Sequence, residues 1–328
     1  MFIKKLIAVI TVVAIASVCF CSCAKKKGAH IPHRFASAEE GRELMLSNDG
    51  YYNNFTQNDL DFKMKKTGAT MDEYKAFAGE QVRDFSFFEK SYINSLISKM
   101  EKTLDKNGYV LPEIDEIVFI KTTMEEEPGA SGYTHGTQIY LSGMLITVNT
   151  YGHLFPGFDE YFQHLMWHEL FHCLTRSDPD FRADMYSLVN FTVTEEDFTI
   201  PASVLEYHIT NPDVEHHNSY ATFIIDGKET DCFTDYVTTM HYAEAQASFM
   251  TCSTTALIPI DGTDVYYAPE QASNFDEVFG NNTGYVIDPE ECMADNFADT
   301  LCYGIEGKDN KGYPNPEIIQ GIIDRLSK

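Results

Sequence analysis

Positively charged residues are scarce in this sequence. Its 328 residues include 24 lysines and arginines against 50 aspartates and glutamates, which gives a formal net charge of −26 at pH 7. A chain this acidic repels phosphate backbones, so we expect no nucleic acid among its partners. The usual meaning of such acidity is a well-solvated protein surface.

Cysteine pairs and linker sequence are also lacking. Of the eight cysteines, five lie beyond residue 23, and no two form a CxxC pair. Their odd number and wide spacing dictate no disulfide framework, and they suggest no thiolate zinc cluster. Neither an internal repeat nor a Pro/Gly/Ser-rich linker divides the chain, whose length suffices for one large domain or two modest ones.

The first 23 residues differ from the rest. Lys4 and Lys5 precede a mostly apolar run, residues 6–21, and this order is typical of an export signal. The run is near the short limit for spanning a bilayer, so a retained anchor is the lesser interpretation. Cys23 follows the small Ser22 and resembles the lipidated cysteine of bacterial lipoproteins. We therefore expect an exported protein held in the membrane by a lipid on Cys23, with ordinary cleavage nearby as the alternative.

The remaining sequence predicts an α+β protein. Breaker-poor stretches with spaced apolar residues indicate helices, and short alternating stretches indicate strands. Residues 190–285 read as short strands and loops. The helices expected are 71–106, from 159 to about 177, 288–303 and 315–326, and the strands expected are 116–122 and 137–142. This succession of helix, strands, helix, insert and helix is an α+β pattern.

Residues 168–172 read His-Glu-Leu-Phe-His. His168 and His172 stand four apart, so on a helix they share one face and can reach one metal ion. Glu169 then lies beside that ion, where a carboxylate can take a proton from water that zinc has made acidic. His164 is also four residues from His168, but that pair would put Leu165 where the base belongs. His164 is therefore expected at the rim of the cleft or on the surface.

The third ligand has two candidates. Asp178 lies six residues after His172, but that arrangement usually needs a glycine where Thr175 stands. Asp178 also precedes Pro179, which suits a helix N-cap.

The second candidate lies in residues 288–301. Glu291 and Asp295 are four apart, so one can bind the ion while the other orients a ligand histidine. Glu290 is the neighbouring option, although its partner four residues on is Ala294. Asp288 and Glu291 also fit a capping box, in which the glutamate only caps its helix. We favour Glu291 as the ligand and Asp295 as its supporting carboxylate.

These two segments together resemble the gluzincin peptidases, in which HExxH is followed on a later helix by Glu-x-x-x-Asp. The resemblance implies a zincin-like domain whose active-site helix packs on a small sheet, with Zn²⁺ as cofactor. Some such peptidases carry a tyrosine shortly before the glutamate ligand to stabilise the oxyanion, and Tyr285 is similarly placed. A packing role is the alternative for Tyr285. The weaker candidates for the oxyanion are Tyr207, Tyr220, His208 and His217.

The sequence therefore predicts four segments: an export signal (1–23), a tether (24–36), a helical N-terminal region (37–110) and a zincin-like metallopeptidase domain (111–328). The predicted function is hydrolysis of peptide or protein substrates outside the cytoplasm by a zinc-activated water, with Glu169 as general base. The alternative is a non-catalytic surface lipoprotein that binds a partner and whose zinc site is structural or degenerate.

Overall fold

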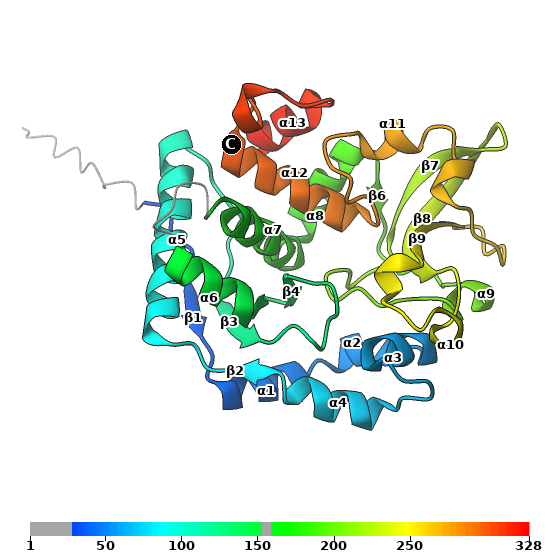
Figure 1. The fold of residues 1–328 in the computed structure, drawn as a ribbon. Helices are drawn as coiled ribbons and strands as arrows, with labels where there is room; N and C mark the ends of the chain where they lie inside the picture. The colour runs from blue at the N-terminus through cyan, green and yellow to red at the C-terminus, as the bar shows by residue number, and fades with distance from the viewer. Residues whose placement is uncertain (1–27, 153–158, 328) are drawn as a thin grey trace, which may run out of the picture.

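The computed structural model describes residues 28–152 and 159–327. The predicted export signal and Cys23 lie outside these residues. The described chain contains thirteen α-helices and two β-sheets, so the predicted α+β class is confirmed. Figure 1 shows the helices of residues 38–79 below the first sheet, the helix of residues 87–107 at the left, and the second sheet at the opposite end of the molecule.

The first sheet has five strands. In order they are β1 (His33–Phe35), β3 (Ile117–Thr122), β5 (Gln138–Ser142) and β4 (Gly132–His135), and β2 (Val82–Arg83) pairs with the end of β3. Strands β1, β3 and β5 are parallel, whereas β4 runs antiparallel to β5 and forms an outer edge. The predicted strands 116–122 and 137–142 are thus β3 and β5. β1 lies within the segment expected to be a tether.

Alternate residues of β3 and β5 enter two different cores, as the two-residue period of a strand requires. Phe119 and Ile139 pack with Trp167 in the larger core. Ile120 and Tyr140 pack in a smaller core on the opposite face. The larger core includes helices α5 (Phe87–Asn107), α6 (Gly143–Gly152) and α7 (Glu160–Ser177), and the smaller includes α1 (Ala38–Leu46) and α4 (Met71–Gly79).

The expected single helix over 71–106 is wrong. The chain forms α4, then β2, then α5, because two capping boxes start two separate helices. Thr70 and Glu73 cap the first, and Ser86 and Glu89 cap the second. Apolar spacing alone did not reveal the break, since both helices carry buried aromatic residues.

The second sheet is antiparallel. Its order is β6 (Thr192–Val193), β7 (Ser219–Ile225), β8 (Lys228–Thr238) and β9 (Ser253–Pro259). Asp226 and Gly227 both have positive φ and join β7 to β8 in a two-residue hairpin turn. The short strands expected in 190–285 are therefore present, although β8 is eleven residues long.

Helix α12 (Pro289–Tyr303) packs along α7, and α13 (Pro316–Leu326) packs on α12, as Figure 1 shows. α12 begins after Asp288 and ends at Gly304, the bounds that the sequence predicts. The remaining helices are α2 (Asp49–Asn53), α3 (Gln57–Met64), α8 (Pro179–Tyr186), α9 (Ala202–Leu205), α10 (Tyr242–Ala245) and α11 (Phe275–Phe279). Within residues 28–152 and 159–327, no helix combines the length and the apolar character needed to cross a membrane.

Candidate metal centre

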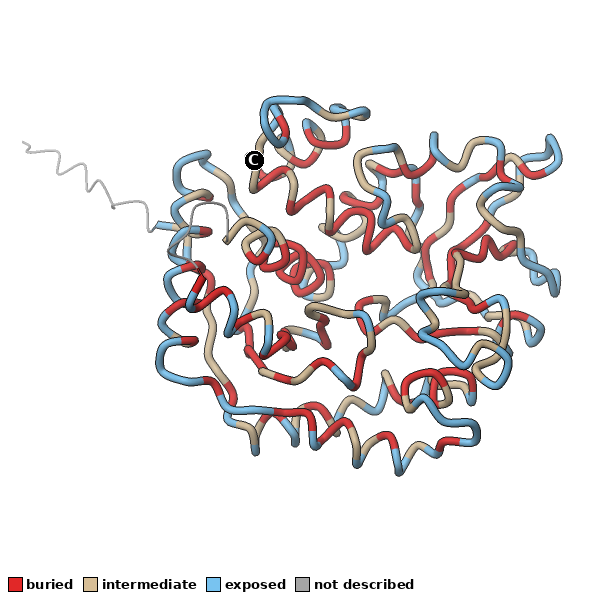
Figure 2. The backbone as a smooth tube through the Cα atoms, viewed as in Figure 1, coloured by how far each residue is buried: buried red, intermediate tan, exposed pale blue. Residues whose placement is uncertain are grey.

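Helices α7 and α12 bring two histidines and a glutamate together. α7 is buried continuously from Leu165 to Thr175, a stretch that includes His168, Glu169 and His172, and Figure 2 colours it red. His168 Nε2 lies 3.1 Å from Glu291 Oε2, and His172 Nε2 lies 3.6 Å from the same oxygen. One ligand atom from each residue lies within 4.8 Å of the others, so this buried group could hold a metal ion.

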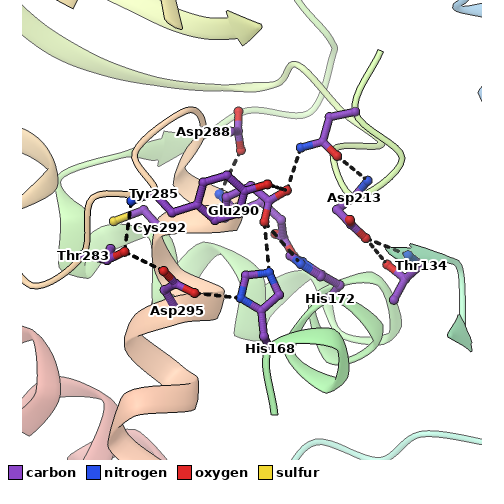
Figure 3. Close-up of polar contacts among 12 residues, drawn as sticks. Thr134, His168, His172, Asp213, Thr283, Tyr285, Asp288, Glu290, Cys292 and Asp295 are labelled. Carbon is purple, nitrogen blue, oxygen red and sulfur yellow. Dashed lines mark hydrogen bonds and ion pairs between the residues drawn. The ribbon is translucent and has the colours of Figure 1, made fainter. Parts of the chain in front are cut away.

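Each histidine is oriented by a second carboxylate from α12. His168 Nδ1 lies 3.0 Å from Asp295 Oδ1, and His172 Nδ1 lies 2.8 Å from Glu290 Oε1 (Figure 3). A carboxylate beside Nδ1 favours the tautomer that keeps its proton on Nδ1 and directs the Nε2 lone pair away. Both Nε2 atoms consequently face Glu291. Sequence reasoning placed Asp295 here but missed the contact of Glu290.

Glu290 is held by more than His172. Its Oε1 also accepts a 2.6 Å hydrogen bond from Thr175 Oγ1, and its Oε2 accepts one from the hydroxyl of Tyr186. Thr175 therefore serves the site through Glu290. The signal that could have found it is the pair of adjacent glutamates: on a helix, residues 290 and 291 diverge in direction, so each can serve a different group of α7.

Glu291 does not cap its helix. Asp288 accepts a 2.8 Å hydrogen bond from the backbone N–H of Glu290, so this N-cap needs no partner from Glu291. Glu291 Oε1 instead accepts hydrogen bonds from Asn211 Nδ2 at 2.6 Å and from the Tyr285 hydroxyl at 3.2 Å. Its other oxygen is left to the histidines.

The two other residues considered from the sequence, Asp178 and His164, have partners outside this group. Asp178 is the N-cap of α8, where it accepts a 3.0 Å hydrogen bond from the backbone N–H of Phe181. His164 is half-buried, and its Nε2 lies 3.1 Å from Asp299 Oδ1. The structure therefore brings Glu291, and not Asp178, beside the two histidines.

The donor set suits a cation on two further observations. His172 Nε2 and Glu169 Oε2 are both buried, and among the described residues neither has a hydrogen-bond partner. Burial alone would lower the pKa of His172, but Asp213, Glu290 and Glu291 outweigh it and raise that pKa to about 10. Negative groups therefore dominate around this imidazole.

Glu169 follows His168 on α7 and is buried. Burial, followed by the charge of Asp213, raises the pKa of Glu169 to about 8. Gly132, in edge strand β4, makes room for this side chain, because a Cβ at that position would lie only 2.6 Å from Glu169 Oε1. Strand β4 thus fixes how closely the chain approaches the carboxylate.

Asp213 is a second acidic residue at the centre that sequence reasoning missed. It lies in the loop before β7, and no motif or spacing distinguishes it from other loop aspartates. Its Oδ1 accepts hydrogen bonds from the backbone N–H of Thr134 at 2.8 Å and from Thr134 Oγ1 at 2.6 Å. One of its carboxylate oxygens lies within 4.8 Å of both a His172 nitrogen and a Glu169 oxygen.

A cleft of about 980 Å³ opens beside these residues. Its walls include Gly132, His168 and Glu169, together with Asp213 and Tyr285. Tyr285 is 40% exposed as a residue. Its ring is nearly parallel to that of His168, with centroids 6.1 Å apart, and its hydroxyl donates to Glu291. The cleft therefore gives an external molecule access to this side of the group.

The weaker oxyanion candidates lie in other surroundings. His208 and His217 both contact Asp235 on the wall of a neighbouring cavity of about 720 Å³. Tyr207 stacks on His241, and Tyr220 lies in β7. Of the five candidates, only Tyr285 contacts a residue of the metal-capable group.

Comparisons of this chain with protein-family models, with curated proteins and with solved structures found no match.

Proposed function

We propose that this protein is a zinc-dependent peptidase of gluzincin type that acts outside the cytoplasm. The observation that carries the proposal is the way in which side chains of α7 and α12 face one another. Two Nε2 atoms and one carboxylate oxygen converge, and each histidine has its own carboxylate at Nδ1. Two imidazoles and one carboxylate are the ligands of many catalytic zinc sites, in which three protein ligands leave a position open.

In this proposal His168, His172 and Glu291 hold the zinc. Bound zinc supplies a Lewis acid that lowers the pKa of a water molecule towards neutrality and polarises the scissile carbonyl. Asp295 and Glu290 keep both imidazoles in the binding tautomer.

Glu169 is the proposed general base. Its unpartnered Oε2 is buried beside the histidines, so it can accept a proton from the attacking water and return it to the leaving amine. Tyr285 lines the cleft, and its hydroxyl, which now donates to Glu291, can turn to donate a hydrogen bond to the developing oxyanion. The substrate would be a peptide or protein chain in the cleft.

The location of the activity is proposed from residues 1–23 alone. An export signal ending in a lipidated Cys23 would place the enzyme on the cell envelope or surface, as a bacterial lipoprotein anchored in the membrane.

One observation favours the second candidate function, a binding lipoprotein with a structural site. Asp213 lies within 4.8 Å of a His172 nitrogen, so it is near enough to compete for the open position. A site closed by four protein ligands would be structural and not catalytic.

The deciding experiment replaces Glu169 with Gln. This variant should keep its zinc and its thermal stability but lose hydrolysis of a broad peptide library by at least about 10²–10⁴-fold, the range typical of general-base assistance. Metal content is measured by elemental analysis and cleavage by mass spectrometry. Cleavage that survives Glu169→Gln would refute the proposed catalyst, and zinc-loaded wild type that cleaves no peptide would favour the binding lipoprotein.

A further inference from the structure

Asp213 lies so close to the metal-capable group that only a part of the substrate next to the scissile bond can reach it. We propose that Asp213 binds the free N-terminal ammonium group of the substrate, which makes the enzyme an aminopeptidase. This inference rests on the proposed peptidase function and names its substrate class.

The first argument is distance. In a peptide, the N-terminal nitrogen of the first residue is only two bonds from the carbonyl carbon of the first peptide bond. A group that binds this nitrogen must therefore lie next to the residues that act on that carbonyl. A carboxylate oxygen of Asp213 is within 4.8 Å of both a Glu169 oxygen and a His172 nitrogen. A carboxylate that recognised a substrate side chain could stand much farther away.

The second argument is that, within the described part of the chain, one oxygen of the Asp213 carboxylate is free to accept a hydrogen bond. Asp213 Oδ1 accepts both hydrogen bonds from Thr134 and lies 4.0 Å from Arg176 Nη2. Among the described residues no hydrogen-bond partner contacts Oδ2. Asp213 is buried and lines the cleft, so an ammonium group entering there would meet an ionic acceptor in a desolvated setting.

The third argument is that Asp213 occupies a backbone donor of the edge strand. Thr134 lies in edge strand β4, and its backbone N–H, directed away from β5, is already donated to Asp213. A longer peptide lying along β4 would need that donor. The loop that carries Asp213 would therefore block a substrate that paired with β4 beyond this carboxylate.

The charge at this end of the cleft also opposes recognition of a C-terminal carboxylate. Arg176 is a cation close to Asp213, but its side chain is only 10% exposed and is already engaged. It donates to Thr134 Oγ1 and to the backbone carbonyls of Pro212 and Asp213, and its Nε lies 2.9 Å from Glu215. The free oxygen of Asp213, Oδ2, can therefore bind a cation but not a carboxylate.

A metal ion is the competing occupant, because Glu169, His172 and Asp213 could also hold one. Nδ1 of His172 contacts Glu290, so only Nε2 is available and it can serve one ion. An ion bound to this second group would therefore replace the ion held by Glu291. The zinc content of Asp213→Asn separates this outcome from the proposal, because an ion held by the second group would be lost in that variant.

The test compares peptides of one sequence with a free or an acetylated N-terminus. Binding is measured by calorimetry on zinc-loaded Glu169→Gln protein, which needs no turnover, and cleavage is measured on wild type by mass spectrometry. Free-amine peptides should bind about 10- to 100-fold more tightly than acetylated ones, the usual worth of a hydrogen bond to a charged group. In wild type, products should lack one residue from the N-terminus.

Asp213→Asn, which can keep its bonds to Thr134, should abolish this preference while zinc content and melting temperature stay unchanged. Asp309→Asn is the matched control: it removes one negative charge from the wall of the same cleft, and asparagine tolerates the positive φ at that position. The control should preserve the preference for the free amine.

Equal binding of free and acetylated peptides by Glu169→Gln protein would overturn the proposal. So would loss of zinc in Asp213→Asn, which would make Asp213 a metal ligand. Internal cleavage of acetylated peptides that depends on Glu169 would refute the aminopeptidase while leaving the peptidase function intact. Failure of the peptidase function itself would show separately, as zinc-loaded wild type that cleaves neither peptide.

Discussion

Glu290→Gln should weaken zinc binding without removing a ligand. Glu290 accepts hydrogen bonds from His172 Nδ1, Thr175 and Tyr186. A glutamine can keep its oxygen towards His172 and Thr175 and offer its amide to the Tyr186 oxygen, since a hydroxyl can also accept. The substitution therefore removes one charge and preserves the packing. Loss of such a supporting carboxylate typically costs about 10- to 100-fold in metal affinity, or roughly 1.4–2.8 kcal/mol.

Glu291→Gln should cost more, because Glu291 is the proposed ligand itself. Structural zinc sites gain about 10–16 kcal/mol from four ligands, so one ligand is worth roughly 3 kcal/mol or more, above about 100-fold. Affinities are measured by competition with a chromophoric chelator at fixed pH. Asp178→Asn is the control and should bind zinc like wild type, since asparagine also caps helices well.

The ranking of these variants is the critical result. Glu290→Gln that binds zinc as tightly as wild type would show that the contact with His172 does not support the metal. Glu290→Gln that loses more affinity than Glu291→Gln would mean that the two adjacent glutamates have the opposite roles. A strong loss in Asp178→Asn would point to the other candidate ligand.

Three further variants test other parts of the structure. Gly132→Ala should cut turnover by roughly 100-fold at unchanged zinc content, since its Cβ would displace Glu169 and small misplacements are costly; unchanged turnover would refute this role. Burial lowers the pKa of His208, but the charge of Asp235 outweighs burial and raises that pKa to about 9. Wild type should therefore lose up to about 3 kcal/mol of stability relative to His208→Gln as the pH rises from 6.5 to above 9. Urea denaturation at both pH values measures the free energy of unfolding, and an equal change in wild type and His208→Gln would contradict the prediction. Cys23→Ala should abolish labelling by a fatty-acid analogue, and unchanged labelling would rule out Cys23 as the lipidated residue.

The sequence predicted the part of the site that depends on helical spacing. Residues four apart share a face of a helix whatever the rest of the fold, so His168 with His172 and Glu291 with Asp295 could be paired in advance. Asp213 could not be found in this way. It reaches the site because a loop contacts strand β4, and loop placement follows from tertiary contacts that leave no period in the sequence.

The fold was predictable to a similar extent. Strands β3 and β5 and helices α7 and α12 have long apolar patterns with clear ends, and they lie close to the predicted ranges. Strand β4 is only four residues long and begins with Gly132, so its sequence shows no recognisable strand pattern. The break between α4 and α5 was missed because apolar spacing continued across two capping signals.

The connection of helix α3 to the metal-capable group has a consequence for how the protein matures. Asp59 of α3 accepts a 2.7 Å hydrogen bond from the backbone N–H of Thr210, and the next residue, Asn211, holds Glu291. Glu291 is itself 123 residues from His168 along the chain. An unfolded chain therefore offers an ion only the two neighbouring histidines, and firm capture must wait until segments from both ends have assembled. Under the proposed function, zinc binding would stabilise the assembled state by mass action, by about 4 kcal/mol at a free metal concentration 1,000 times the Kd. Scarcity of zinc would accordingly reduce the amount of folded protein as well as the proposed activity.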